Sequence, residues 1–234
     1  MPRGRAEDYG AKRQEILDAA AAVFARTGYA NSNMLDVARV CGASKSMLYH
    51  YFPRKEGVLF ELMLEHVSAV RRSIEDLVAG TASAEERLRG FVRMWIAKSA
   101  SARSRHAVLM YDLKFLPPRQ KRAIAEARRD LVEQVAGIVG ELNPRVQSGD
   151  WARTYALLLF GMLNWTDVWY RSTGPYSPVD LAEQVLRVFL RGLGVDGAAT
   201  AVVRSGEEGR PRLQPTRAAA GGGRDSRSRG TARR

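Results

Sequence analysis

Apolar residues recur every three or four positions through most of this chain, which is the spacing of an amphipathic helix. No segment sustains the alternation of a half-buried strand, and no Asn-Gly or Asp-Gly turn lies between two strand-like runs. Glycines and prolines such as Gly28, Gly42, Pro53 and Gly80 interrupt the pattern where helices would end. The sequence therefore predicts an all-α protein of about nine helices.

The spacing of these interruptions also predicts how the helices are organised. A first helix of about four turns ends at Gly28, and Ser32 or Asn33 caps a short second helix. Further helices are expected at 44–51, 55–78, 83–100, 104–115, 119–139, 150–171 and 178–192. We thus expect a small head at 1–54, joined by the long helix to a helical bundle at 55–194.

The end of the chain differs in composition. Between Ser205 and Arg234, Leu213 is the only large apolar residue, among six glycines and eight arginines. Such a segment cannot bury enough apolar surface to offset the entropy lost on ordering. We therefore expect a disordered basic tail, which we place at 195–234.

Net charge is +12, and much of it lies at the two ends. Residues 1–55 hold nine basic and five acidic side chains, and residues 205–234 hold eight and three. Basic ends favour a polyanionic partner such as nucleic acid, although solubility alone also explains such a charge.

Several classes of protein are disfavoured by simple absences. The longest apolar run has eight residues, at 156–163, whereas a membrane span needs about 20. A single cysteine, Cys41, excludes an internal disulfide framework, and the first fifteen residues lack a signal-peptide pattern. We therefore expect a cytoplasmic protein without a membrane partner.

Catalysis has little support in the sequence. There is no phosphate-binding loop, no zinc-protease motif and no nucleophile elbow, and the three histidines are widely separated. The expectation is a protein that is not an enzyme and that has no cofactor and no metal site. A helical enzyme with a vestigial head stays a remote alternative.

Two short helices around Gly42 and Ala43 have the spacing of a helix-turn-helix unit. The first turn of the second helix presents Lys45, Ser46 and Met47, which suit contacts to base edges in a major groove. Packing of this short helix inside a bundle is the alternative reading.

The rest of the second helix divides its side chains between two faces. Tyr49, His50 and Tyr51 supply donors for phosphate oxygens, and Leu48 and Phe52 are expected to face the core of the head. Three adjacent polar aromatic residues argue against complete burial, because each would need a hydrogen-bond partner.

Residues 12–62 resemble the amino-terminal DNA-binding domain of TetR-type transcriptional regulators. The likeness is carried by Phe24-x-x-x-Gly28-Tyr29, Val37-Ala38, Gly42-Ala43-Ser44-Lys45, Leu48-Tyr49-x-Tyr51-Phe52 and Lys55-Glu56. The resemblance implies that Lys45 and Ser46 approach base edges, and that Ser44, Tyr49, Tyr51 and Lys55 hold phosphates. The full candidate DNA-binding set is Asn33, Ser44, Lys45, Ser46, Met47, Tyr49, His50, Tyr51 and Lys55.

The same resemblance implies a body that binds a small molecule and forms a homodimer through its last two long helices. The chain is then a repressor that binds a palindromic operator in double-stranded DNA and is released by an effector. A ligand-independent repressor or an activator of the same fold are the alternatives. Wide apolar arcs at 151–170 and 181–193 are compatible with an interface, although core packing explains most of them.

The stretch at 160–177 resembles a segment of the acyl-CoA-responsive branch of that family. An acyl-CoA thioester needs an apolar slot and basic groups for its phosphates. A solvated helix face is the commoner explanation of the arginines near 119–129. The candidate effector-binding residues are His106, Met110, Arg122, Arg128, Arg129, Phe160, Asn164, Trp165 and Trp169.

Overall fold

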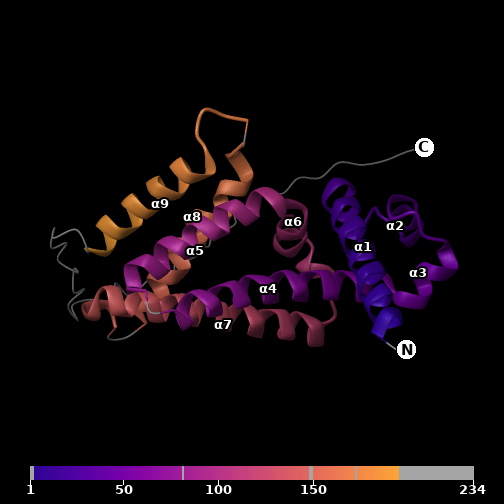
Figure 1. Cartoon of the computed structure of the whole chain (residues 1–234), viewed down its shortest axis with the longest axis horizontal. Helices are drawn as coiled ribbons and strands as arrows, with labels where there is room; N and C mark the ends of the chain where they lie inside the picture. Colours follow the sequence, from indigo (N-terminus) through magenta and orange to yellow (C-terminus); the bar gives the residue numbers. More distant parts are fainter. Residues whose placement is uncertain (1–2, 81, 148–149, 172, 195–234) are drawn as a thin grey trace, which may run out of the picture. The chain divides into compact units, whose positions relative to one another are not determined.

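The computed structural model describes residues 3–80, 82–147, 150–171 and 173–194, and the tail expected at 195–234 lies outside them. Within the described residues the chain forms nine α-helices, two short 3-10 helices and no strand, as the all-α prediction requires (Figure 1). The helices are α1 (Arg3–Thr27), α2 (Met34–Val40), α3 (Lys45–Tyr51), α4 (Lys55–Ala79), α5 (Ala84–Ser101), α6 (Arg103–Tyr111), α7 (Pro118–Leu142), α8 (Trp151–Trp169) and α9 (Pro178–Leu193), with the 3-10 helices η1 (Leu113–Phe115) and η2 (Pro144–Val146).

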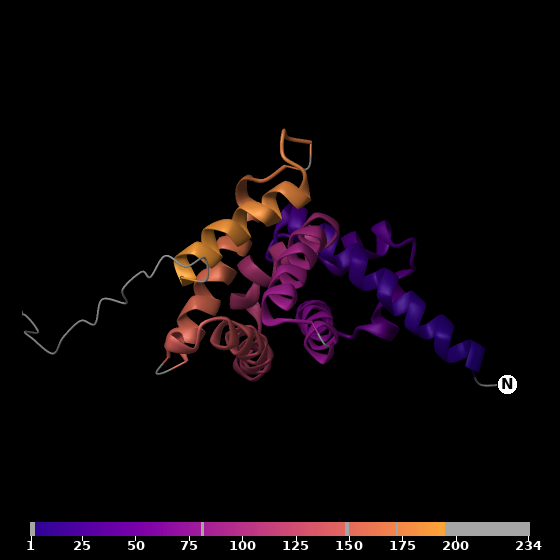
Figure 2. The same ribbon diagram turned by 60° about the vertical axis from the view of Figure 1, so that its left-hand side comes forward.

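Helix α1 is longer than the apolar pattern predicts, because it begins at Arg3 and continues unbroken to Thr27 (Figure 2). The ring of Tyr9 stacks on that of Tyr51 in α3, with centroids 4.5 Å apart and an interplanar angle of 25°. This contact anchors the polar amino-terminal half of α1, whose residues carry no apolar stripe that sequence reasoning could detect.

The short helices of the head begin and end at identifiable caps. The side chain of Asn33 accepts hydrogen bonds from the backbone N–H groups of Leu35 and Asp36, at 2.9 and 3.0 Å. The Asp36 carboxylate accepts in turn from the Asn33 backbone, which completes a capping box. Gly42 has φ of 62°, a left-handed conformation that permits the tight turn between α2 and α3. Asn33, one of the two predicted caps, is therefore confirmed.

The core of the head is continuous with part of the body. Leu48 and Phe52 are buried, as the sequence predicted, against residues of α1 and α4. The same apolar cluster extends to Val108 and Leu109 of α6 and Ile124 of α7. The head therefore packs directly on α6 and on one end of α7.

A second apolar cluster occupies the body and draws on α4, α5, α7, α8 and α9. Helix α7 packs on α4 and α8, and α5 packs on α9. Helix α4 contributes Val58 and Leu59 to the cluster in the head and Val70 and Ile74 to the cluster in the body. The long helix thus joins the two cores.

One predicted helix is shorter in the structure than in the sequence-based expectation. The helix expected at 104–115 ends at Tyr111, and the chain tightens into η1 before Pro117. Leu116 is extended, with ψ of 147°, because a proline disfavours helical geometry in the residue that precedes it. No helix in the described part of the chain combines the length and apolar character needed to cross a membrane.

Candidate nucleic-acid interface and internal cavity

Helix α3 presents one polar face to solvent and buries the other. Lys45, Ser46 and Met47 are exposed in its first turn, and Tyr49 and His50 follow on the exposed side. This face therefore offers a cation, a hydroxyl group and an apolar tip together, a combination that can read base edges.

Several of the predicted DNA-binding residues already hold structural roles. The hydroxyl oxygen of Ser44 accepts from the backbone N–H of Met47 at 3.1 Å, so Ser44 caps α3 while its own proton stays available. Asn33 caps α2 through its side-chain oxygen. Tyr51 is half-buried and stacked on Tyr9, so it is less accessible than Tyr49.

Lys55, which the resemblance implies would hold a phosphate, contacts the protein's own backbone in the structure. It is half-buried, and its ammonium group donates to the backbone carbonyls of Tyr29 and Ser32. The group also lies 4.0 Å from the centroid of the Tyr29 ring. Burial lowers the pKa of Lys55, with Glu56 and Asp112 opposing the shift. The side chain thus ties the start of α4 to the α1–α2 loop, where the Tyr29 carbonyl also accepts from the hydroxyl group of Ser32.

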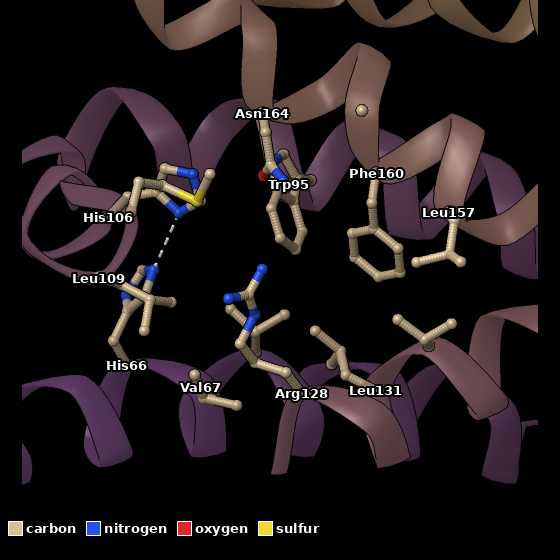
Figure 3. Close-up of a pocket in the computed structure, with 14 residues that line it drawn as sticks. His66, Val67, Trp95, His106, Leu109, Arg128, Leu131, Leu157, Phe160 and Asn164 are labelled. Atoms are coloured by element: carbon tan, nitrogen blue, oxygen red, sulfur yellow. Dashed lines mark hydrogen bonds between the residues drawn. The ribbon is translucent and has the colours of Figure 1, made fainter. Parts of the chain in front are cut away.

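A cavity of about 230 Å³ lies within the body, between α4, α5, α6, α7 and α8 (Figure 3). Its walls are mainly apolar, and polar side chains enter it from four helices. The apolar walls include Val67, Trp95, Leu109, Met110, Leu131, Leu157 and Phe160, and the polar groups are His66, His106, Arg128 and Asn164.

The two histidines in this cavity contact each other. His66 Nε2 lies 3.3 Å from His106 Nδ1 (Figure 3). His106 Nε2 lies 3.3 Å from the Oδ2 of Asp167. Burial lowers the pKa of His66 to about 3, and His106 and Arg105 add to the shift. Burial also lowers the pKa of His106, against the opposing influence of Asp167. Both rings are therefore neutral near pH 7.

Which neutral ring donates in this pair depends on which ring nitrogens carry the protons. If His106 carries its proton on Nε2, facing Asp167, its Nδ1 accepts from the Nε2–H of His66. No group of three or more metal-binding side chains forms among the described residues. The histidine pair is thus a hydrogen-bonded polar element within an apolar wall.

The structure brings together only part of the predicted effector set. His106, Met110, Arg128, Phe160 and Asn164 all line the cavity. Arg122 and Arg129 are instead exposed on α7, and Arg129 borders a separate open groove with Glu133 and Arg153. Trp165 and Trp169 are 65% and 50% exposed and lie outside the cavity lining. Successive turns of a helix present residues in different directions, so closeness in sequence did not place these four in the cavity.

Sequence reasoning missed His66 and Trp95 as cavity residues. In the sequence, His66 lies among apolar residues of the long helix such as Leu62 and Val67. A histidine among leucines and valines was the available signal, but its partner on α6 could not be identified without the tertiary structure.

Helix α8 also has an apolar face that the described residues do not cover. The exposed side chains Trp151, Leu158, Trp165 and Trp169 recur at intervals of seven, seven and four residues, which places them on one stripe. Val188 of α9 is exposed as well. We call Trp151, Leu158, Trp165 and Trp169 the α8 stripe.

Comparisons with known proteins match both parts of the chain. Residues 16–62 match the family described as bacterial regulatory proteins, tetR family. Residues 81–193 match the family described as tetracyclin repressor-like, C-terminal domain.

Individual relatives are similar over most of their length. A TetR-family transcriptional regulator from Bordetella parapertussis is 36% identical, with a TM-score of 0.71 over 76% of this chain and 93% of that one. The transcriptional repressor KstR2 of Mycobacterium tuberculosis is 28% identical over 80% of this chain and 94% of its own. FadR of Bacillus subtilis, solved in complex with stearoyl-CoA, is 26% identical. Its TM-score is 0.61 over 76% of this chain and 98% of that one.

Proposed function

The chain belongs to the tetR family of bacterial regulatory proteins, and from this premise we propose that it is a repressor released from DNA by a small-molecule effector. In this proposal residues 1–54 bind DNA, and residues 55–194 bind the effector and form the dimer. The observation that carries the proposal is the mainly apolar cavity in the body, because α6 connects its wall to the head.

The exposed face of α3 would read the operator. Lys45, Ser46 and Met47 would meet base edges, while Tyr49 and His50 would meet phosphates. A dimer would place two such helices about 34–36 Å apart, in successive major grooves of a palindromic site. Protein charge of +12 favours the encounter with DNA.

The α8 stripe supports the dimer. Large apolar side chains rarely gather on the surface of a monomer without a partner. A second copy of α8 and α9 packed on this stripe would bury four of them at once.

An acyl-CoA thioester is the effector class that we propose. The apolar walls of the cavity suit an acyl group, and the exposed Arg122 and Arg129 on α7 suit the phosphates of coenzyme A. The complex of FadR with stearoyl-CoA supports this choice by similarity. Release requires that the thioester bind the DNA-free form more tightly than the DNA-bound form.

The test begins with selection of the operator from random DNA by the purified protein. Operator complexes are then titrated with phenylacetyl-CoA, isovaleryl-CoA and stearoyl-CoA in a gel-shift assay, with free coenzyme A as the control. We expect release by at least one thioester and none by coenzyme A. If the protein selected no DNA, the proposal that it is a repressor would be wrong. If the operator complex stayed intact with every thioester, a ligand-independent regulator would be favoured.

A further inference from the structure

Within the described part of the chain, no carboxylate forms an ion pair with the guanidinium group of Arg128. It points from α7 into the cavity, towards Trp95 and Asn164 (Figure 3). Arg128 forms no ion pair and no hydrogen bond with another residue in the described ranges, whereas Arg89 pairs with Glu183 and Arg153 pairs with Glu133. The arginine that enters the cavity therefore differs from arginines of the body that form ion pairs.

Among the described residues, the groups around Arg128 are apolar or neutral, except for Asp167 beside His106. Leu131 and Phe160 beside it are apolar, and the two histidines are neutral near pH 7. The carboxylate of Asp167 contacts His106, and no ion pair joins it to Arg128. A cation in such a partly enclosed apolar site loses hydration without gaining a partner, so an anion would be strongly favoured there.

The size of the cavity restricts what can carry that anion. A cavity of about 150 Å³ with apolar walls accommodates benzene, and drug-sized ligands occupy about 300–1,000 Å³. At about 230 Å³, this cavity suits a benzene-sized ring or a short branched chain with one polar substituent.

We propose that this cavity binds a carboxylate carried on a compact apolar group, with the carboxylate oxygens on the guanidinium group of Arg128. A planar guanidinium group and a carboxylate can form two parallel hydrogen bonds, which gives both affinity and orientation. The inference rests on the proposed function, in which the same cavity receives the effector, and it narrows the class of effector. The carboxylate belongs either to a free acid or to the far end of a dicarboxylic acid that is joined to coenzyme A by its other end.

The experiment compares ligands that differ in the carboxylate alone. Phenylacetate is matched with phenylacetamide, and glutaryl-CoA is matched with pentanoyl-CoA, which has the same number of acyl carbons. Binding to the full chain is measured by calorimetry. A charge-assisted pair of hydrogen bonds should make the carboxylate member bind about tenfold or more tightly in at least one of the two pairs.

Variants of the protein test whether Arg128 is responsible. Arg128→Leu should abolish the preference for the carboxylate member, and Arg128→Lys should keep it in weaker form because the charge remains. Arg72→Leu removes an exposed arginine of α4 outside the cavity lining and should leave the preference unchanged. Melting temperatures of the three variants check that each is folded.

The outcomes separate this inference from the proposed function. Three outcomes would overturn the carboxylate site. They are equal or weaker binding of both carboxylate members, no binding of any of the four compounds, and a preference for the carboxylate that survives in Arg128→Leu. If pentanoyl-CoA alone released the operator, the proposal of a thioester effector would stand and the proposal of a carboxylate site would be rejected. Tight binding of phenylacetate or glutaryl-CoA without release of the operator would preserve the site and reject its effector role.

Discussion

Lys45 and Lys55 lie on consecutive helices, yet their surroundings assign them different tasks. Lys45 is exposed in the first turn of α3, where its ammonium group is free to approach a base. Lys55 is half-buried, and its ammonium group donates to the carbonyls of Tyr29 and Ser32 in the α1–α2 loop. A lysine that binds the protein's own backbone has fewer donors left for phosphate.

The two lysines should therefore respond differently to substitution. Lys55→Met should lower the free energy of unfolding by about 1–2 kcal/mol, because buried carbonyls lose a charged donor. Lys45→Ala should leave stability within about 0.5 kcal/mol of the natural protein and weaken operator binding by about 1–3 kcal/mol. Urea unfolding and operator binding of both variants measure these effects. Unchanged stability of Lys55→Met would show that its backbone contacts contribute little.

His66 should make stability depend on pH. Its pKa is lowered from 6.5 to about 3 in the folded chain, so between these values the unfolded chain binds more protons. Stability is therefore fully present above about pH 6.5 and falls as pH falls towards 3, by roughly 2 kcal/mol at pH 5 for this group.

The variant His66→Asn keeps a polar side chain and removes the titration. Its stability should decline less than that of the natural protein between pH 7 and pH 5, as measured by urea unfolding. His50→Asn, at an exposed position on α3, is the matched control and should follow the natural protein. An equal decline in all three would show that His66 does not set the acid sensitivity.

At the scale of the element, α6 connects the cavity to the head. His106, Leu109 and Met110 line the cavity, and one turn later η1 places Phe115 against Tyr29, with ring centroids 5.1 Å apart. Arg105 of the same helix pairs with Asp18 of α1 at 2.6 Å. A shift of α6 on ligand binding would thus be transmitted to α1 and to the α1–α2 loop.

Weakening this contact should reduce coupling without removing either binding activity. The variant Phe115→Ala should bind effector alone and operator alone with little change in affinity. The coupling free energy between the two sites, which we expect to be about 1–3 kcal/mol in the natural protein, should fall. Effector affinity measured with and without operator gives the coupling. Full coupling in this variant would show that α6 and η1 do not transmit the effect. Tyr111→Ala, which removes an exposed ring at the end of α6, is the control.

The sequence predicted most element boundaries closely, and the exceptions have physical causes. Helices α7, α8 and α9 begin and end within a few residues of expectation, because prolines and caps mark them. The amino-terminal half of α1 was missed, since the stacking of Tyr9 on Tyr51 joins residues far apart in the chain. The end of α6 was missed because a 3-10 turn satisfies the same backbone groups as a helix.

At the scale of the whole molecule, the α8 stripe predicts assembly. Leu158 is 57% exposed at its centre, so Leu158→Arg should place a charge in the proposed interface and shift the protein from dimer to monomer. Light scattering after size-exclusion chromatography measures the mass. Operator affinity should fall together with dimerisation, because one head contacts only half of a palindrome.

Val78→Arg is the matched control for this substitution. Val78 is 41% exposed on α4, outside the stripe, so the same change there should leave the mass unchanged. A dimeric Leu158→Arg protein would place the interface elsewhere.

By itself, the sequence determined the helical class and the helix-turn-helix unit. These features depend on local spacing, because caps, turn glycines and apolar periodicity act within a few residues of one another. The face of α3 followed from the same logic, since burial of Leu48 and Phe52 leaves Lys45 and Tyr49 outside.

Only the tertiary structure decided which side chains share the cavity and which bind the protein itself. His66 meets His106 across 40 positions of sequence, and Arg128 enters the cavity while Arg129, the next residue, faces away from it. Adjacent residues of a helix point about 100° apart, so a run of arginines in sequence does not form one site in space. The position of the α1–α2 loop likewise decided that the ammonium group of Lys55 donates to backbone carbonyls.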